Sequence, residues 1–219
     1  MEKEVRDTWE ENAREWIDVV SSGQIASRRF TDVAIQDMLK SLSGPKVLDV
    51  GCGEGWLTRR LSKMGKRATG VDAIETLLAY ARSRGPEPYQ CLSYADIIAG
   101  NAIINAPFDT AVFNFSLYRK DDVDILFKII KGQLTDQGYI VVQTLHPYFL
   151  IQNGLEYKSQ MIRDSWKGLP GNFTGGHSWY ARTLGDWVKL VTSADLKIVD
   201  IKETLNAENK PISLILAIS

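Results

Sequence analysis

The chain has 219 residues, with 26 basic and 27 acidic side chains and a formal net charge of −1, which excludes the basic surplus that a general nucleic-acid binder needs. Two cysteines, Cys52 and Cys91, are too few for a disulfide scaffold, and no apolar run approaches the ~18 residues of a membrane span. The N-terminus carries acidic residues and no apolar segment, which predicts a protein without a signal peptide and therefore a cytoplasmic one.

The first 43 residues are expected to form two helices. Apolar residues between positions 5 and 20 recur about every four residues, which places them on one helical face. Ser-Ser-Gly at 21–23 separates this helix from a second one, whose apolar residues at 35–42 follow the i, i+3, i+4, i+7 spacing of an amphipathic helix. Gly44 and Pro45 then end the second helix.

From residue 46 the pattern alternates between strands and helices. Strands are expected at 46–50, 67–71, 89–92, 108–113 and 139–145, and helices at 56–64, 74–82 and 123–130. This alternation predicts βαβ units and a parallel sheet with right-handed crossovers.

The alternation stops after residue 145. Residues 146–182 are rich in glycine and aromatic residues and show no clean period, and an irregular stretch of this length in a compact domain is typical of a functional lid. Thr183 begins a capping box ahead of a last helix. Residues 198–201 and 212–218 then predict an antiparallel hairpin at one edge of the sheet.

Three glycines lie between the first expected strand and helix, in Val-Leu-Asp-Val-Gly-Cys-Gly-Glu-Gly at 47–55. Open α/β sheets bind ligands at the carboxyl ends of their strands, and glycines there allow the backbone to approach a ligand closely. The helix that follows offers free N–H groups. A tight turn without a ligand is the alternative, but three glycines in five residues exceed what a turn needs.

The loop does not fit a dinucleotide. A dinucleotide loop has the pattern G-x-G-x-x-G, whereas Trp56 stands in place of the third glycine and Glu54 would repel the phosphates. Asp72 follows the second strand and can accept hydrogen bonds from both ribose hydroxyls, although a lone aspartate there is more often a helix cap. Together these features favour a nucleoside with a cationic head and no phosphate, as in S-adenosylmethionine.

VLDVGCGEG followed by GVDA resembles the cofactor signature of class I S-adenosylmethionine-dependent methyltransferases. Residues 93–96, 108–116 and 134–142 are similar to the adenine-contacting segment and to the fourth and fifth strands of that family. The helix around 9–16 is similar to the lid helix of its small-molecule branch. The resemblance covers about 46–145 and implies an α/β, doubly wound, Rossmann-like sheet of seven mostly parallel strands whose last strand is antiparallel.

The resemblance implies one domain over 1–219 that transfers a methyl group from S-adenosylmethionine to a small molecule and releases S-adenosylhomocysteine. Its parts would be N-terminal lid helices at 1–43, a cofactor-binding core at 46–145, a substrate cap at 146–182, and a final helix and hairpin at 183–219. The implied cofactor-binding residues are Asp49, Gly51, Cys52, Gly53, Asp72, Ala73, Ile74, Ala95, Asp96, Asn114 and Phe115.

Within that set, the resemblance implies that Asp49 lies near the ammonium or sulfonium group of the cofactor. It further implies that Asp72 holds the ribose hydroxyls and that Asp96 accepts from the adenine amino group. Gly51 and Gly53 would pass beneath the methionine part.

Several side chains are candidates for the acceptor site. His146 directly follows the fifth strand and is suited to be a general base, or it is simply a polar residue that starts a loop. Tyr118 and Trp179 are expected to line the acceptor site, with core packing as the alternative. His177, in the segment 146–182, is more typical of a flexible surface histidine, with a lid that brings it into the site as the alternative. No Cys/His cluster has the spacing of metal ligands, so no metal is expected.

Two other functions stay open from the sequence. One is a cofactor-binding protein that has lost catalysis and serves as a regulator or partner. The other is an NAD-type oxidoreductase, which Glu54, Trp56 and the missing glycine disfavour. The expected partner is a small molecule rather than a nucleic acid, the expected assembly is a monomer or homodimer, and O-, N- and C-methylation stay open.

Overall fold

A computed structural model describes residues 2–42 and 44–219, so positions 1 and 43, at the ends of the expected N-terminal helical region, lie outside the described residues. The strands of the main sheet are β1 (Lys46–Val50), β2 (Arg67–Asp72), β3 (Tyr89–Cys91), β4 (Phe108–Asn114), β5 (Leu134–Leu145), β8 (Ile198–Leu205) and β9 (Pro211–Ile218). Their order across the sheet is β3-β2-β1-β4-β5-β9-β8. The order reverses at β1, between β2 and β4, which is where open α/β sheets bind ligands.

The strands from β1 to β5 pair in parallel, whereas β9 is antiparallel to both of its neighbours, β5 and β8. The hairpin expected at one edge is therefore confirmed. Its second strand, β9, lies inside the sheet and its first strand, β8, forms the edge.

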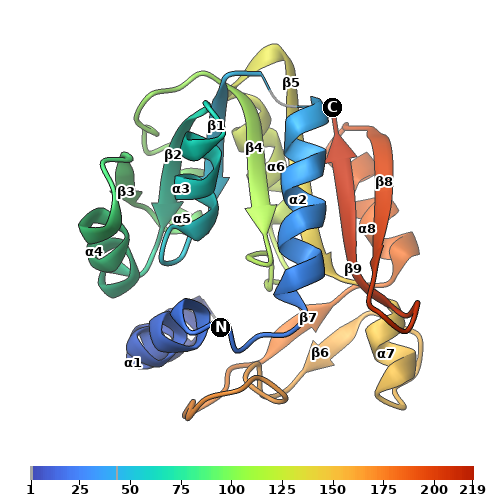
Figure 1. The fold of residues 1–219 in the computed structure, drawn as a ribbon. Coiled ribbons are helices and arrows are strands. Elements are labelled where there is room, and N and C mark those ends of the chain that lie inside the picture. The colour runs from blue at the N-terminus through green and yellow to red at the C-terminus, as the bar shows by residue number, and fades with distance from the viewer. Residues whose placement is uncertain (1, 43) are drawn as a thin grey trace.

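Helices cover both faces of this sheet. They are α1 (Glu2–Ser21), α2 (Arg28–Leu42), α3 (Trp56–Lys63), α4 (Glu75–Arg84), α5 (Tyr94–Ile98), α6 (Val123–Lys131), α7 (Tyr148–Gln152) and α8 (Leu184–Ser193). α2 and α3 pack on one face, and α5, α6 and α8 pack on the other (Figure 1). The predicted doubly wound α/β fold with an antiparallel last strand is confirmed. Among the described helices, none combines the length and apolar composition needed to cross a membrane.

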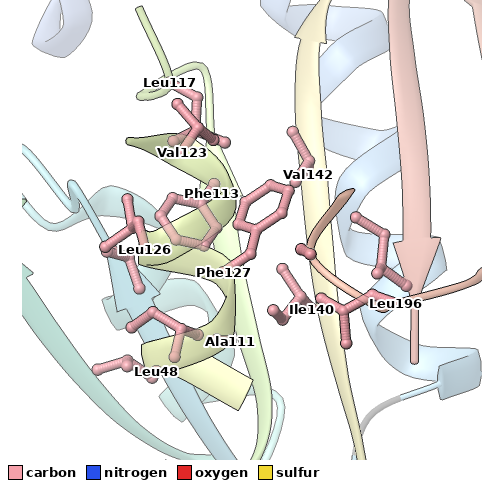
Figure 2. Packing of buried hydrophobic residues seen from close by; sticks show 14 of the residues in the cluster. Leu48, Ala111, Phe113, Leu117, Val123, Leu126, Phe127, Ile140, Val142 and Leu196 are labelled. Carbon is pink, nitrogen blue, oxygen red and sulfur yellow. The ribbon is translucent and has the colours of Figure 1, made fainter. Parts of the chain in front are cut away.

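The central strands are mostly apolar because both of their faces are covered. In β4, Ala111 and Phe113 pack with the α6 layer, while Val112 between them packs with the α2 layer, as the twofold period of a strand requires. Figure 2 shows Phe113 facing Phe127 of α6, and their ring centroids are 5.7 Å apart. The core thus fixes the strands whose carboxyl ends carry the candidate site.

The segment 146–182, which we call the cap, is more regular than expected. It contains α7 and a two-stranded antiparallel ribbon of β6 (Gln160–Ile162) and β7 (Trp179–Ala181). The prediction of an irregular stretch is therefore wrong in part, because elements of three to five residues are too short to show a period. Figure 1 shows this ribbon and α1 beyond the carboxyl end of β4, on the side where the chain leaves the parallel strands.

A core substitution tests this packing. Phe127 is fully buried, so Phe127→Ala removes ring contacts and leaves a cavity, and we expect the free energy of unfolding to fall by about 3–5 kcal/mol. Ile125, on the same helix, is 43% exposed, and Ile125→Ala should cost less than about 1 kcal/mol. Urea denaturation of both variants gives the comparison, and equal losses would contradict the packing described.

Candidate active site

A cavity of about 1280 Å³ lies between the carboxyl ends of the parallel strands, α1 and the cap. Most of the residues predicted from the sequence line it: Gly51, Cys52, Gly53, Asp72, Ala73, Ile74, Ala95, Asp96, Asn114, Phe115, Tyr118 and Trp179. Its volume exceeds the ~300–1,000 Å³ of an ordinary small-ligand pocket, so it has room for two ligands side by side.

The glycine loop between β1 and α3 forms part of the wall. Gly51 and Gly53 both have left-handed backbones, with φ of +74° and +55°. A Cβ atom at Gly51 would lie 2.4 Å from Ser116 Cβ, whereas at Gly53 the nearest neighbour would be Trp16 Nε1 at 3.9 Å. Gly51 is therefore required by the packing of the fold itself, and Gly53 leaves the backbone open toward the cavity.

Asp72, at the end of β2, ties this loop to the start of α4. Its Oδ2 accepts a hydrogen bond from the Gly53 N–H at 2.8 Å, and its Oδ1 accepts one from the Ile74 N–H at 2.9 Å. The Ala73 N–H also hydrogen-bonds to this carboxylate, whose roughly four acceptor sites still leave capacity for a ligand. The sequence left two alternatives for Asp72, a helix cap or a ligand-binding residue. In the structure Asp72 both contacts the start of α4 and lines the cavity.

Three acidic side chains gather around the loop. Asp49 is 1% exposed, lies behind the cavity wall and accepts a hydrogen bond from Thr58 Oγ1 at 2.7 Å. Burial, with a smaller contribution from Glu54 and Asp72, raises the pKa of Asp49 to about 7. Burial also raises the pKa of Glu54 and that of Asp72. Arg28 and Arg59 partly offset the effect of burial on Glu54. Desolvated carboxyl groups favour a positively charged ligand.

Glu54 is the carboxyl of this group that sequence reasoning missed as a binding residue. Its side chain lines the cavity, Oε2 accepts from Trp16 Nε1 at 3.3 Å, and the buried Oε1 has no hydrogen-bond partner among the described residues. In the sequence, Glu54 only argued against a cofactor that carries phosphate groups. Asp49, predicted to lie near a cationic group, does not line the cavity and acts on it only electrostatically, through Glu54 and Asp72.

Asp96 lies in the first turn of α5, a short helix that the sequence analysis did not predict. Its Oδ2 accepts from the Ser93 backbone N–H at 2.9 Å and from Ser93 Oγ at 2.6 Å, while Ser93 Oγ accepts from the Asp96 N–H, which completes a capping box. These hydrogen bonds lower the pKa of Asp96. The second carboxylate oxygen, Oδ1, takes no part in the capping box, and Asp96 lines the cavity.

The end of β4 completes this side of the cavity. Asn114 Oδ1 is buried and has no hydrogen-bond partner among the described residues. Phe115 has a φ of +52°, a strained conformation for a bulky residue of the kind found at ligand sites. Ser116 Oγ donates to the Val50 carbonyl at 2.7 Å and so holds the end of β4 to the end of β1.

The other end of the cavity is a chamber of rings formed by Trp9, Tyr118, Trp166, His177 and Trp179, which we call the aromatic chamber. The ring centroids of Trp9 and Trp166 are 4.7 Å apart, and those of Tyr118 and Trp179 are 6.3 Å apart. Tyr118 and Trp179, predicted to line the acceptor site, both line the cavity, and their role toward an acceptor stays a prediction. The position of Trp166 could be anticipated only from the density of aromatic residues in the cap.

His177 is buried, contrary to the surface position expected for it. Its side chain is 1% exposed, and burial lowers its pKa to about 4. Nδ1 lies 3.0 Å from Ser165 Oγ, while Nε2 is buried without a hydrogen-bond partner among the described residues. The imidazole is therefore neutral at neutral pH.

His146, predicted as a candidate base, does not line the cavity. Its Nδ1 accepts from the Tyr148 N–H at 3.0 Å, and its Nε2 lies 2.7 Å from Glu203 Oε1 on β8. Both ring nitrogens are thus used in holding α7 against the hairpin. The prediction that His146 acts on the acceptor is not supported. Where the chain leaves β5, the His146 side chain points toward β8 and away from the cavity.

Asn12 of α1 joins the N-terminal helix to the cap, and no sequence pattern pointed to it. Its Nδ2 donates to the Thr174 carbonyl and its Oδ1 accepts from the Thr174 N–H, both at 2.8 Å. Glu15 Oε1 accepts from the Asn172 N–H at 2.6 Å. α1 and the cap therefore close the cavity as one wall. In the described chain, no group of three or more His, Cys, Asp and Glu side chains could hold a metal ion.

Comparison with known proteins gives a consistent result. The family model described as a methyltransferase domain matches residues 25–201. A ubiquinone biosynthesis O-methyltransferase from Bradyrhizobium diazoefficiens is 26% identical over 161 residues, which are 72% of this chain and 57% of that protein. The chain thus matches little more than half the length of this curated relative.

Solved structures share the fold. An S-adenosylmethionine-dependent methyltransferase from Mesorhizobium loti has a TM-score of 0.64 and 21% identity, over 84% of this chain and 95% of that one. The 1,6-didemethyltoxoflavin-N1-methyltransferase of Burkholderia thailandensis, with bound 1,6-didemethyltoxoflavin and S-adenosylhomocysteine, has a TM-score of 0.70 and 16% identity, over 99% and 87%. At these identities the likeness concerns the fold.

The two cavity glycines are expected to respond differently to alanine. Gly51→Ala adds a steric clash with Ser116 to a left-handed backbone, and should lower the free energy of unfolding by about 2–5 kcal/mol. Gly53→Ala meets only the backbone strain, about 1–2 kcal/mol. Chemical denaturation measures both, and a Gly53→Ala loss as large as that of Gly51→Ala would contradict the open position of Gly53.

The buried Asp49 should make stability depend on pH. Between its usual pKa of 3.8 and its raised value of about 7, the native chain holds a proton that the unfolded chain has released. The free energy of unfolding therefore falls as pH rises through this window. Asp49→Asn keeps an acceptor for Thr58 but has no carboxyl group to titrate. From about pH 4 to about pH 8, its free energy of unfolding should therefore rise by up to about 4 kcal/mol relative to that of wild type.

Urea denaturation at both pH values tests this expectation. Asp136→Asn, at an exposed position, is the matched control and should stay parallel to wild type. A constant difference between Asp49→Asn and wild type across the pH range would show that folding does not raise the pKa of Asp49.

Proposed function

Because the chain belongs to the methyltransferase domain family, we propose that it transfers a methyl group from S-adenosylmethionine to a small molecule. One observation carries this proposal: a continuous cavity has desolvated acidic groups at one end and a neutral chamber of rings at the other. The first environment suits a cationic nucleoside without phosphates, and the second suits an uncharged acceptor.

The residues at the acidic end fit the cofactor. Gly53 leaves open space for the methionine part, and Asp72 keeps free lone pairs for the ribose hydroxyls. The unpartnered oxygens Glu54 Oε1 and Asn114 Oδ1 would accept from its ammonium group. Buried polar atoms without partners are rare in native proteins, and a missing ligand explains both.

The adenine ring would lie between the start of α4 and the start of α5. Ala73 and Ile74 offer apolar surface on one side, and the Ala95–Asp96 backbone lies on the other side of the same cavity. Asp96 Oδ1, which the capping box leaves unused, would accept from the adenine amino group.

S-adenosylmethionine would supply a methyl group already activated by its positive sulfur, so alignment is the chain's main contribution. Phe115 and Tyr118 follow β4 at the boundary between the two ends of the cavity. The cap and α1 exclude water from this boundary through their mutual hydrogen bonds at Asn12 and Glu15.

The size of the cavity and the names of related proteins both support a small acceptor. A volume of about 1280 Å³ holds a nucleoside and one further small molecule. Relatives are named for ubiquinone biosynthesis and for 1,6-didemethyltoxoflavin. A cofactor-binding protein without catalysis is the second candidate. An NAD-type oxidoreductase is disfavoured, because Glu54 lies buried in the wall where phosphates would bind.

Calorimetric titration with S-adenosylhomocysteine and with NAD tests the cofactor assignment. We expect S-adenosylhomocysteine to bind and NAD not to bind. Asp72→Ala removes charge-assisted hydrogen bonds to the ribose and to Gly53, and should weaken S-adenosylhomocysteine at least about tenfold.

The exposed Asp136→Ala is the matched control and should bind like wild type. NAD binding in place of S-adenosylhomocysteine would reject the proposed function. Binding of S-adenosylhomocysteine without methyl transfer to any member of a broad small-molecule panel would favour the non-catalytic alternative.

A further inference from the structure

The main sheet ends differently at its two edges. At one edge β3 has three residues, whereas at the other β8 has eight and contains no proline. Natural edge strands are usually short or blocked, because their unpaired N–H and C=O groups can recruit another strand. Three large apolar side chains of β8 are nonetheless exposed: Val199, Ile201 and Leu205. Figure 1 shows β9 on one side of β8 and the open edge on the other, where an added strand can extend the sheet.

The backbone of Ile201 faces this open edge. Its N–H donates to Asp200 Oδ1 at 2.8 Å and so turns away from β9. In an antiparallel ladder the N–H and the carbonyl of one residue point the same way, so the Ile201 carbonyl also faces outward. The stretch 200–204 pairs with β9 without interruption, and the irregularities of the ladder lie on either side of it. The centre of β8 is therefore a regular edge whose exposed N–H is covered by the Asp200 side chain.

The charged side chains of β8 lie on one face of the sheet and Ile201 lies on the other. Asp200 and Lys202 are opposite β9 residues that pack in the α2 layer, whereas Ile201 is opposite Leu216, which packs with the α6 and α8 layer. Within the described chain, neither Asp200 nor Lys202 has an ion-pair partner. A strand with a cation opposite Asp200 and an anion opposite Lys202 would supply both, and β8 itself carries that pattern.

We propose that the protein is a homodimer in which β8 of two copies pairs antiparallel about a two-fold axis at Ile201, which joins the two sheets into one. An axis perpendicular to the sheet keeps each side chain on its own face, so it passes through a residue. At Ile201 it places the two Ile201 side chains opposite each other and Asp200 opposite Lys202 of the second copy, in both directions. An axis at Asp200, Lys202 or Glu203 would place two like charges opposite each other.

Dimer formation changes the partners of two groups at this edge. The Asp200 carboxylate leaves the Ile201 N–H and pairs with Lys202 of the second copy. The two Ile201 residues then exchange N–H···O=C hydrogen bonds, as in a hydrogen-bonded pair of an antiparallel ladder. The same carboxylate therefore protects the edge in the single chain and selects the pairing register in the dimer.

Sedimentation velocity over a range of protein concentrations tests the assembly. Wild type should sediment with twice the mass of one chain and dissociate on dilution. Ile201→Lys places two lysines at the axis and should raise the dissociation constant at least about tenfold. Ile104→Lys is the matched control, because Ile104 is also exposed and its N–H is held by Gln90 of β3, at the opposite edge. This control should match wild type.

Charge variants test the register. Asp200→Lys places a lysine opposite Lys202, and Lys202→Asp places an aspartate opposite Asp200. Each should raise the dissociation constant about tenfold, because symmetry turns two attractive pairs into two repulsive ones. The double variant Asp200→Lys/Lys202→Asp restores opposite charges and should return to within about threefold of wild type. Loss of the Asp200 contact with the Ile201 N–H would not produce this rescue.

The outcomes are distinct from those that test the proposed function. Wild type that stays monomeric at every concentration would overturn the inference. So would a dimer that survives Ile201→Lys or that the charge exchange does not restore, since it would form through another surface. S-adenosylhomocysteine should bind every variant like wild type, because β8 does not line the cavity. Wild type that dimerises without binding S-adenosylhomocysteine would reject the proposed function alone. If Ile201→Lys fails to fold, the charge variants carry the test.

Discussion

The wall that α1 and the cap form together depends on the pairing of the Asn12 side chain with the backbone of Thr174. This amide meets both the N–H and the carbonyl of one cap residue, as a neighbouring strand would, and Asn12 is itself 3% exposed. Leaving the buried Asn12 amide unpaired costs about 1–3 kcal/mol. Because Ala13, the next residue of α1, packs on Ile74 and Leu77, the helix joins the cap to the cofactor side of the cavity.

Closure creates two environments in one cavity. Trp16 of α1 covers Glu54, and burial there raises the pKa of the carboxyl groups around the glycine loop. The cap supplies rings and a neutral His177 at the other end. Under the proposed function, a methyl donor with a positive sulfur would lie between them, with its charged part toward the acids and its methyl group toward the rings. The same wall would then contribute to both the cofactor end and the acceptor end.

The sequence predicted the sheet, and it predicted residues that the structure brings to one cavity, because local patterns determine both. The glycines of the first loop and Asp72 follow from spacing and backbone geometry, and they line the cavity at the carboxyl ends of the strands. The side chains at the cap end of the cavity were predicted less well. Whether His146 or His177 lies beside the cavity depends on how residues 146–182, whose elements are very short, fold back on α1. The contact between them is made through Asn12, and it produces no periodic pattern in the sequence.

A crystal structure of the protein with bound S-adenosylhomocysteine would show directly how the cofactor lies in the cavity. We expect the ribose hydroxyls on Asp72 and the amino group near Glu54 and Asn114. We also expect the sulfur beside Phe115, with its open side toward Tyr118 and the aromatic chamber. A ligand whose sulfur faces away from the aromatic chamber, or one bound outside the cavity, would contradict the proposed roles of these residues.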